Sequence, residues 1–438
     1  MNKILLIIFI SIFTHCSFDN KSGIWKNEEN LSKKDERFKD FKKFYSKLEP
    51  YNKIKYPSEN LKILLDPSAS NFVWSDEYYN NSNNLKNFNY KNNNELIFLS
   101  KKISRFKNNE NILFDSDRAI ISDKKGNILV YSFEKKDIEL KYNFYKKQYK
   151  KKEKIIKISL DNKIIYAADN LGYLYALNYQ TGELVWAQNF KIPFRSNIKI
   201  FNNKIVLADI NNNLLILNKI DGTKFKFIPT EEVTLNNEFI NSIAHNNNSI
   251  FYLNTYGSLY SINNKGQLNW FLNLKQSLDD ESNLFYSKVL LLHKKKIYLA
   301  TDFYFYKIDI DTGAILFKIP IISKTKPIVS GDSIFLITKD NLLVCINKND
   351  GNILYSININ QEIANFLETK KKEVYIKSLA LINNNLYVFL KNSYSVIFKV
   401  TGTIENINKL PSKINSHPIY INDSIIYLNK KNKLAIVN

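Results

Sequence analysis

The sequence predicts an all-β protein, an eight-bladed β-propeller of four-stranded antiparallel blades whose last blade is closed by an N-terminal strand. A pattern of three short strands and two turns recurs along the chain, with first strands that begin near residues 118, 164, 205, 250, 297, 334, 386 and 425. This spacing of about 40 to 50 residues is typical of four-stranded propeller blades. The eighth repeat reaches Asn438 before its third strand, so we expect a strand from the other end of the chain to complete it.

The clearest repeat spans residues 164–190. An apolar strand at 164–168 leads to a turn around Gly172, which can adopt a positive φ without strain. Strands at 173–178 and 183–190 follow, and because three strands cannot bury both faces, each repeat needs neighbours. The segments between repeats supply a fourth strand, which we expect to lie innermost in the ring. These strands are predicted at 155–160, 197–201, 241–245, 288–293, 326–330, 374–382 and 417–421.

Aromatic side chains mark the third strand of most repeats. They follow the second turn glycine by four residues, and we expect them to wedge between adjacent blades as part of the core. They are Trp186, Trp270, Phe317 and Tyr355. Residues 71–74 carry Trp74 in the equivalent place, so we expect these residues to be the strand that closes the eighth blade.

The N-terminal residues 1–15 resemble a lipoprotein signal peptide. Lys3 precedes an apolar run of ten residues, 4–13, which is too short to span a bilayer. Cys16 follows at once, in the place of the lipid-modified cysteine of bacterial lipoproteins, where acyl chains such as palmitate would give a stable anchor. By resemblance to Gram-negative sorting, Ser17 favours the outer membrane, whereas His15 departs from the usual small residue. An unmodified cysteine in an ordinary signal peptide is the alternative.

Residues 16–66 are expected to form a periplasmic tether, and residues 67–438 the propeller. Within the tether, residues 33–48 place aromatic side chains at helical spacing. The sequence leaves open whether this segment is a helix that packs on the propeller, lies on the membrane or binds a partner, or a partly ordered linker. Cys345 lies in an apolar strand and is expected to be a small core residue.

The sequence contains no motif for catalysis, for a metal or for a cofactor, so it predicts a protein that is not an enzyme. The four histidines lack the carboxylate or cysteine spacing of a metal site. The net charge of +21 would attract anionic lipid, nucleic acid or an acidic partner, but it also fits a solvated surface in a lysine-rich proteome. Because the lysines are scattered and not interleaved with aromatic residues, we do not expect nucleic acid as a partner.

Two connections between repeats carry acidic residues in this basic chain. Glu231 and Glu232 lie in residues 228–238, and Asp279, Asp280 and Glu281 lie in residues 273–287. Loops on a rigid scaffold commonly carry binding residues, so these five are the candidate partner-binding residues. Solvated connections without a binding role are the alternative.

The repeat YAADNLGYLYALNYQTGELVW closely resembles the pyrroloquinoline-quinone (PQQ)-like propeller repeat. Quinoprotein dehydrogenases use this repeat to hold a quinone over calcium, and they need an adjacent cysteine pair, an acidic base and a cluster of metal ligands. The BamB family of outer-membrane assembly lipoproteins uses it without a quinone. The signal peptide, Cys16, the eight repeats and the closing strand resemble the BamB arrangement.

The BamB resemblance implies a non-catalytic scaffold lipoprotein of the outer-membrane β-barrel assembly (BAM) complex. Such a protein is lipid-anchored at the periplasmic face of the outer membrane, docks on the POTRA domains of BamA beside other BAM subunits, and assists the folding and insertion of outer-membrane proteins. Asp279 and Asp280 correspond to an acidic pair of the family, whereas the family's Leu-x-Leu-Arg patch is absent. Unfolded outer-membrane proteins could also pair with exposed blade edges.

Two alternative functions stay open at this point. One is an envelope module that binds peptidoglycan or polysaccharide, and the other is a quinoprotein dehydrogenase.

Overall fold

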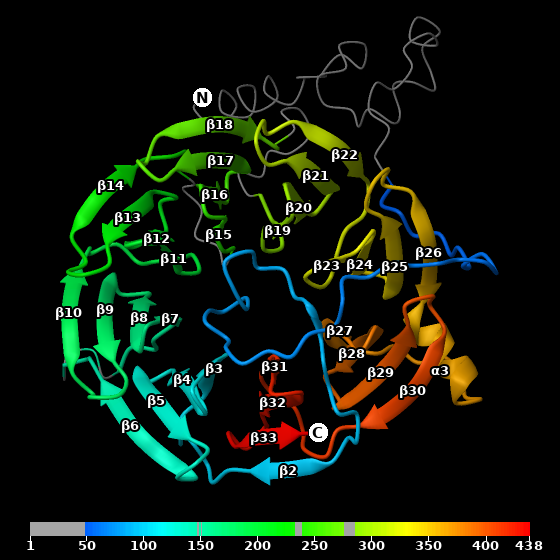
Figure 1. The fold of residues 1–438 in the computed structure, drawn as a ribbon, viewed down its shortest axis with the longest axis horizontal. Coiled ribbons are helices and arrows are strands. Elements are labelled where there is room, and N and C mark those ends of the chain that lie inside the picture. Colours follow the sequence, from blue (N-terminus) through cyan, green and yellow to red (C-terminus); the bar gives the residue numbers. More distant parts are fainter. Residues whose placement is uncertain (1–48, 147–148, 150, 233–238, 276–284) are drawn as a thin grey trace, which may run out of the picture. The chain divides into compact units, whose positions relative to one another are not determined.

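A computed structural model describes residues 49–146, 149, 151–232, 239–275 and 285–438. The chain divides into two compact units, Met1–Glu49 and Pro50–Asn438. The second unit is a ring of eight antiparallel sheets around a central axis (Figure 1), which confirms the predicted fold class. Cys16 and the predicted helix at 33–48 lie outside the described residues.

Each blade is built from its innermost to its outermost strand in chain order, except that the outermost strand of the eighth blade comes from the N-terminal part of the chain. The strands of blades one to four are β3 (Asn108–Asp115), β4 (Arg118–Asp123), β5 (Asn127–Ser132), β6 (Asp137–Asn143); β7 (Ile156–Asp161), β8 (Ile164–Asp169), β9 (Tyr173–Asn178), β10 (Leu184–Asn189); β11 (Lys199–Phe201), β12 (Lys204–Ala208), β13 (Leu214–Asn218), β14 (Lys224–Ile228); and β15 (Ser242–His245), β16 (Ser249–Leu253), β17 (Ser258–Asn263), β18 (Leu268–Asn273).

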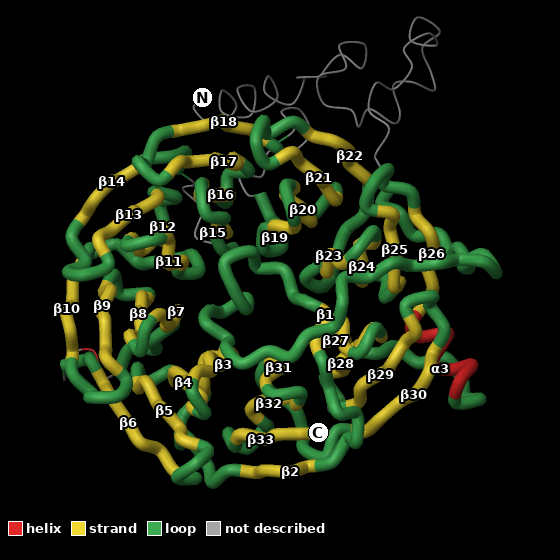
Figure 2. Tube along the Cα trace, viewed as in Figure 1, coloured by secondary structure: helices red, strands yellow, loops and turns green. Residues whose placement is uncertain are grey.

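The strands of blades five to eight are β19 (Leu291–His293), β20 (Lys296–Ala300), β21 (Phe305–Asp309), β22 (Ile315–Ile319); β23 (Ile328–Ser330), β24 (Ser333–Ile337), β25 (Leu342–Asn347), β26 (Ile353–Asn358); β27 (Ile376–Ile382), β28 (Asn385–Leu390), β29 (Tyr394–Lys399), β30 (Ile404–Lys409); and β31 (Ile419–Ile421), β32 (Ser424–Leu428), β33 (Leu434–Val437), β2 (Leu96–Leu99). A short strand, β1 (Asn87–Phe88), pairs with β27 in parallel, and one helix, α3 (Ile359–Phe366), joins blades six and seven on the outside of the ring (Figure 2).

The predicted repeats match the blades closely. Each predicted first strand begins within one residue of the second strand of a blade, and the predicted fourth strands overlap the innermost strands β7, β11, β15, β19, β23, β27 and β31. In blade two the middle strands β8 and β9 are buried except at end residues, because neighbouring blades cover both faces, whereas the outermost strand β10 has only exposed and half-buried positions. Continuous apolar runs are what a strand covered on both faces requires.

The strand that closes the eighth blade is β2 and not residues 71–74, so the predicted role of Trp74 is wrong. In β2, Leu96 pairs with Val437 and Leu99 pairs with Ala435, on the outer side of β33. The physical reason lies in the connection that follows, because β2 leads directly to β3 at the inside of blade one. The other blades are joined in the same way, by a connection from the outermost strand of one blade to the innermost strand of the next. Residues 71–74 lie too far from β3 in sequence to form such a connection.

The predicted docking aromatics lie against turn glycines of the next blade. The Trp186 ring covers Gly222 so closely that a Cβ atom there would lie 2.6 Å from Cζ3, and its Nε1 donates to the Lys219 carbonyl at 3.1 Å. Trp270 covers Gly313 in the same way and donates to the Ile310 carbonyl at 3.0 Å. Phe317 and Tyr355 face Gly351 and Gly402. Each of these blades is therefore joined to the next by an aromatic ring seated on a side-chain-free turn.

Residues 69–91, which we call the axial segment, run around the inside of the ring (Figure 1). The segment contacts the innermost part of every blade in order. Its bonds to the blades are listed here from the eighth blade, through the first, to the seventh: Asn422 N to Asn71 O, Trp74 N to Phe114 O, Leu160 N to Ser75 O, Lys199 Nζ to Asp76 Oδ2, His245 N to Asn81 O, Leu292 N to Ser82 O, Asn84 Nδ2 to Val329 O, and Asn383 N to Phe88 O.

Trp74 belongs to this segment. Its ring packs with Tyr79, Phe88 and Tyr420, with centroid distances of 4.8, 6.0 and 6.1 Å. The segment is therefore anchored by an aromatic cluster as well as by hydrogen bonds, and it fills the axis with the chain's own residues.

Residues 50–66, which the sequence assigned to the tether, contact blades five and six. Tyr51 N donates to the Pro320 carbonyl at 2.7 Å, and Lys55 forms a β-bridge with Ser356 on the outermost strand β26. Asp66 accepts from Gly331 N at 3.0 Å at the inner side of blade six. This stretch thus crosses the ring from outside to inside before the axial segment begins.

Candidate functional site

The inside of the ring holds two cavities that share the axial segment as a wall. Both are lined by β7, the first by its last residues (Ser159 to Asp161) and the second by its first residues (Ile156 and Lys157). The two cavities therefore lie toward opposite ends of the innermost strands. We call them the asparagine-lined cavity, with a volume of about 320 Å³, and the lysine-lined cavity, with a volume of about 610 Å³.

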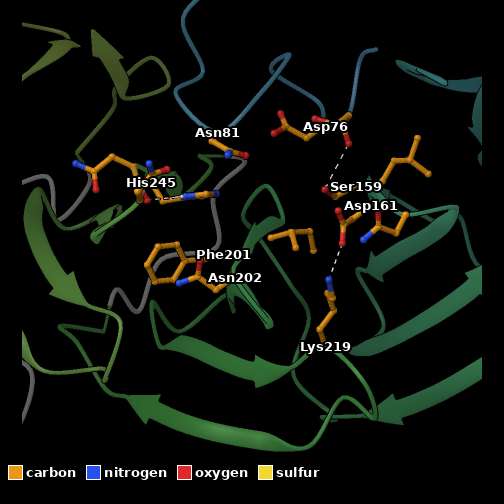
Figure 3. Close-up of a pocket in the computed structure, with 14 residues that line it drawn as sticks. Asp76, Asn81, Ser159, Asp161, Phe201, Asn202, Lys219 and His245 are labelled. Carbon is orange, nitrogen blue, oxygen red and sulfur yellow. Dashed lines mark hydrogen bonds and ion pairs between the residues drawn. The ribbon is translucent and has the colours of Figure 1, made fainter. Parts of the chain in front are cut away.

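The asparagine-lined cavity is polar and close to neutral in charge (Figure 3). Its lining includes Asn81, Asn162, Asn202, Asn246 and Asn247. Its charged side chains are mostly paired, since Lys219 Nζ lies 2.7 Å from Asp161 Oδ2, and burial lowers the pKa of His245 to about 4 so that this ring is uncharged at neutral pH. The cavity offers amide groups and little net charge.

A buried ion pair lies beside this cavity, and its Asp76 belongs to the lining. Asp76 on the axial segment lies 2.6 Å from Lys199 Nζ on β11, and their side chains are 4% and 1% exposed. Lys199 also donates to the Asn80 carbonyl at 2.6 Å. Burial raises the pKa of Asp76, an effect that the nearby ammonium of Lys199 opposes. The pair holds the axial segment to blade three, and removing either partner would leave a buried charge alone.

The lysine-lined cavity has a very different character. Among the described residues that line it are seven lysines and two glutamates: Lys107, Lys124, Lys157, Lys288, Lys324, Lys326, Lys377, Glu77 and Glu110. Lys157 pairs with Glu77 at 2.7 Å, and Lys377 lies 3.8 Å from Glu110. Burial lowers the pKa of Lys326 to about 7, and burial likewise lowers the pKa of His417 to about 4. Lys124 also pairs with Glu153 at 2.8 Å, and the lysines among the described lining residues still outnumber these three glutamates.

Two long connections reach the rim of the lysine-lined cavity. Phe239, from the connection between β14 and β15, packs edge to face on Tyr286, from the connection between β18 and β19, with ring centroids 4.9 Å apart. Both residues line the cavity. These are the connections in which the sequence placed the acidic residues, and Asp279, Asp280 and Glu281 lie outside the described residues.

Glu231 and Glu232 occupy different environments. The Glu231 carboxylate accepts hydrogen bonds from Tyr260 Oη at 2.6 Å, Ser258 Oγ at 2.9 Å and Asn254 Nδ2 at 3.0 Å. Burial alone would raise the pKa of Glu231, but these hydrogen bonds outweigh it and lower the pKa. Glu232 is exposed. Glu231 therefore ties its connection to blade four, while Glu232 faces solvent.

Sequence reasoning did not identify the lysine-lined cavity, although a signal was present. Lys288, Lys326, Lys377 and His417 occur seven or eight residues before the second strand of their blades. Comparing the repeats at this position would have placed all four at one end of the ring. The lysines were missed because each is isolated in the sequence.

Known proteins resemble this chain in sequence pattern and in fold. A family model described as "Outer membrane protein assembly factor BamB" matches residues 146–357 and 242–437. No curated protein sequence matches the chain. Among solved structures, BamB from Moraxella catarrhalis aligns with a TM-score of 0.61 at 15% identity, over 78% of this chain and 100% of that chain.

Two other solved structures align about as well. Quinohemoprotein alcohol dehydrogenase from Comamonas testosteroni gives a TM-score of 0.63 at 9% identity, over 84% of this chain and 81% of that chain. The computationally designed Ika8 protein gives 0.55 at 11% identity, over 77% and 99%. At such identities the structural likeness shows the fold alone.

The side chains that the structure describes do not fit a quinone held over calcium. The chain's cysteines, Cys16 and Cys345, are not adjacent, and Cys345 is buried. Within the described ranges, no three His, Cys, Asp or Glu side chains gather as a metal site would require. The larger cavity is lined by ammonium groups, which would repel a divalent cation. We therefore derive no catalytic step through such a group. Among the described residues, no helix is both long enough and apolar enough to cross a membrane.

Proposed function

This chain belongs to the family of the outer membrane protein assembly factor BamB, and from that premise we propose that it is a non-catalytic scaffold of an outer-membrane β-barrel assembly machinery. The family match supports this proposal because it runs from before β7 to the end of β33, across blades two to eight. The overall fold cannot distinguish a scaffold of the BamB kind from a dehydrogenase, since a dehydrogenase structure aligns as well as a BamB structure does. The chemistry of the site has to decide, and the side chains inside the ring favour binding over catalysis.

The binding surface that we propose is the rim of the lysine-lined cavity. Two long connections meet there through Phe239 and Tyr286, on a ring of eight packed blades that holds them in place. We propose that Asp279, Asp280, Glu281 and Glu232 contact the POTRA domains of BamA. Glu231 then has a positioning role, because its carboxylate is already occupied by three hydrogen bonds within blade four.

We further propose that residues 1–15 are a signal peptide and that Cys16 carries the lipid anchor. Two or more acyl chains on one cysteine would hold the protein stably at the periplasmic face of the outer membrane. The ring would then work close to the membrane into which new β-barrels are inserted.

The proposal is tested by purifying the tagged protein from solubilised membranes and identifying its companions by mass spectrometry. We expect BamA and its lipoprotein companions, and we expect the variant D279K/D280K to recover much less BamA. The matched control is E134K/E183K, which reverses two exposed carboxylates on blades one and two. Recovery of wall material without any assembly subunit would overturn the proposed function. Equal recovery of BamA by both variants would overturn the assignment of the rim.

A further inference from the structure

The lysine-lined cavity has a concentrated positive charge that the composition of the chain does not explain. Seven lysines and two glutamates line it among the described residues, whereas Asp76 and Asp161 accompany Lys219 in the asparagine-lined cavity at the other end. A general excess of lysine would act on both ends alike. The lysines also come from separate blades, so only the closed ring brings them together.

Several buried polar atoms around this cavity have no hydrogen-bond partner within the part of the chain that the structure describes. They are both amide atoms of Asn108, Thr325 Oγ1, Ser378 Oγ and Glu77 Oε2. Asn108 is only 1% exposed, and all four residues line the cavity. Buried donors and acceptors are costly to leave unpaired. Their presence in the lining of one cavity indicates a ligand that offers both hydrogen-bond donors and acceptors, as a peptide backbone does.

Apolar side chains are exposed around the opening. Ile155 and Ile240 line the cavity and are 48% and 41% exposed, and Phe239 and Tyr286 pack at the rim. Tyr375, which is 61% exposed, lies two residues before Lys377. An inorganic anion or a nucleic acid backbone would leave these side chains in water. A ligand with both carboxylates and apolar side chains would use the lysines and the rim together.

We propose that the lysine-lined cavity binds an acidic, partly apolar peptide segment of a protein partner. The inference rests on the proposed function only in taking the partner to be a protein that approaches this end of the ring. The cavity volume of about 610 Å³ lies within the range of about 300–1,000 Å³ typical of ligand sites. It would admit a few side chains of an extended segment, with their carboxylates against the lysines.

The test measures binding of a fluorescein-labelled peptide, in which Asp or Glu alternates with Leu or Phe, to the purified full chain by fluorescence anisotropy. The key variant is K107Q/K288Q/K324Q. Glutamine can keep the hydrogen bonds that Lys288 donates to Tyr286 and Lys324 donates to Asn341. The control variant is K141Q/K399Q/K409Q, which removes the same charge from exposed positions on β6, β29 and β30.

We expect the key variant to bind the peptide about 30-fold more weakly, from a loss of about threefold for each lysine, and the control to bind normally. A peptide with Lys in place of Asp and Glu should not bind. Thermal unfolding shows whether the key variant is folded, and if it is not, the exposed single change K107Q should still weaken binding about threefold. Equal weakening in the key and control variants would overturn the inference. Displacement of the labelled peptide by inorganic phosphate, at the same concentration at which unlabelled peptide displaces it, would also overturn the inference.

The inference and the proposed function can fail separately. If the peptide does not bind while the wild-type protein recovers BamA, the inference is wrong and the function stands. If the peptide binds while no assembly subunit is recovered, the function is wrong and the inference stands. The rim variant D279K/D280K should keep full peptide binding, because the inference places the site on the lysines.

Discussion

Replacing Gly222 with alanine tests whether the aromatic contacts between blades carry the stability of the ring. Gly222 has φ +71°, and its missing Cβ would lie 2.6 Å from the Trp186 ring. Gly182 has φ +78° in the same kind of turn, but its nearest neighbour is Leu140 Cδ1 at 3.2 Å. We expect G182A to cost about 1–2 kcal/mol, the cost of a left-handed alanine. G222A should add about 1–3 kcal/mol of overpacking.

Urea unfolding followed by far-UV circular dichroism measures both changes. The effect of alanine on the unfolded chain is common to the two variants, so their difference reports the contacts of the added Cβ with the Trp186 ring and with Gln188 Cγ, which would lie 2.9 Å away. The double variant W186A/G222A removes the indole, and in the W186A background G222A should cost less than in the wild-type background, because only the close approach to Gln188 Cγ remains. Equal destabilisation by G182A and G222A, or no relief in the W186A background, would refute the reasoning. The midpoints can be compared directly only if the slope m is unchanged.

Two further predictions concern groups inside the ring. K199M should destabilise the protein by about 3–5 kcal/mol in urea unfolding, because it leaves the buried Asp76 carboxylate alone. The double variant D76L/K199M should lose less than the sum of the single changes, and strict additivity would contradict the pairing. Burial lowers the pKa of His245 and of His293 to about 4, below the unfolded value of about 6.5, so the unfolded chain binds more protons between these pH values. Stability should therefore fall as the pH drops from 6.5 to 4, by up to about 1.4 kcal/mol per pH unit for each histidine. H245Q/H293Q should show a shallower slope in urea midpoints measured across that range, and an unchanged slope would contradict the prediction.

The repeats could be predicted from the sequence because their causes are local. A glycine or asparagine turn and an apolar run recur along the chain, with an aromatic residue in most repeats, and each requirement acts within about 25 residues. The prediction that an N-terminal strand closes the eighth blade is confirmed, but the prediction assigned that strand to the wrong residues. The pattern around Trp74 resembles an outer strand, and only the outer-to-inner connection from β2 to β3 distinguishes the two candidates.

The candidate site was less accessible to sequence reasoning. The acidic connections stand out because their residues are adjacent, whereas the lysine-lined cavity draws its lysines from positions 107 to 377. Glu231 shows the converse problem. Its sequence suggests an exposed carboxylate beside Glu232, but Tyr260, Ser258 and Asn254 come from the next blade to bind it. Whether a charged side chain is free or occupied depends on neighbours that only the fold supplies.

The asparagines of the axial segment also have a role that depends on neighbours supplied by the fold. Except in blade seven, where β1 pairs with β27, the innermost strand of each blade is an edge strand, with backbone groups that need partners inside the ring. Asn83 donates to the carbonyls of Ile243 and Leu290, on blades four and five, at 2.9 and 2.8 Å. Asn84 both donates to the Val329 carbonyl at 2.8 Å and accepts from Val329 N at 3.1 Å, as a backbone amide would. An asparagine side chain carries one donor group and one acceptor, so it can pair with a strand edge without being part of a strand. This role is hard to see in the sequence, because the whole chain is rich in lysine and asparagine. The asparagine side chains nevertheless explain how an irregular segment can pair with strand edges along the axis.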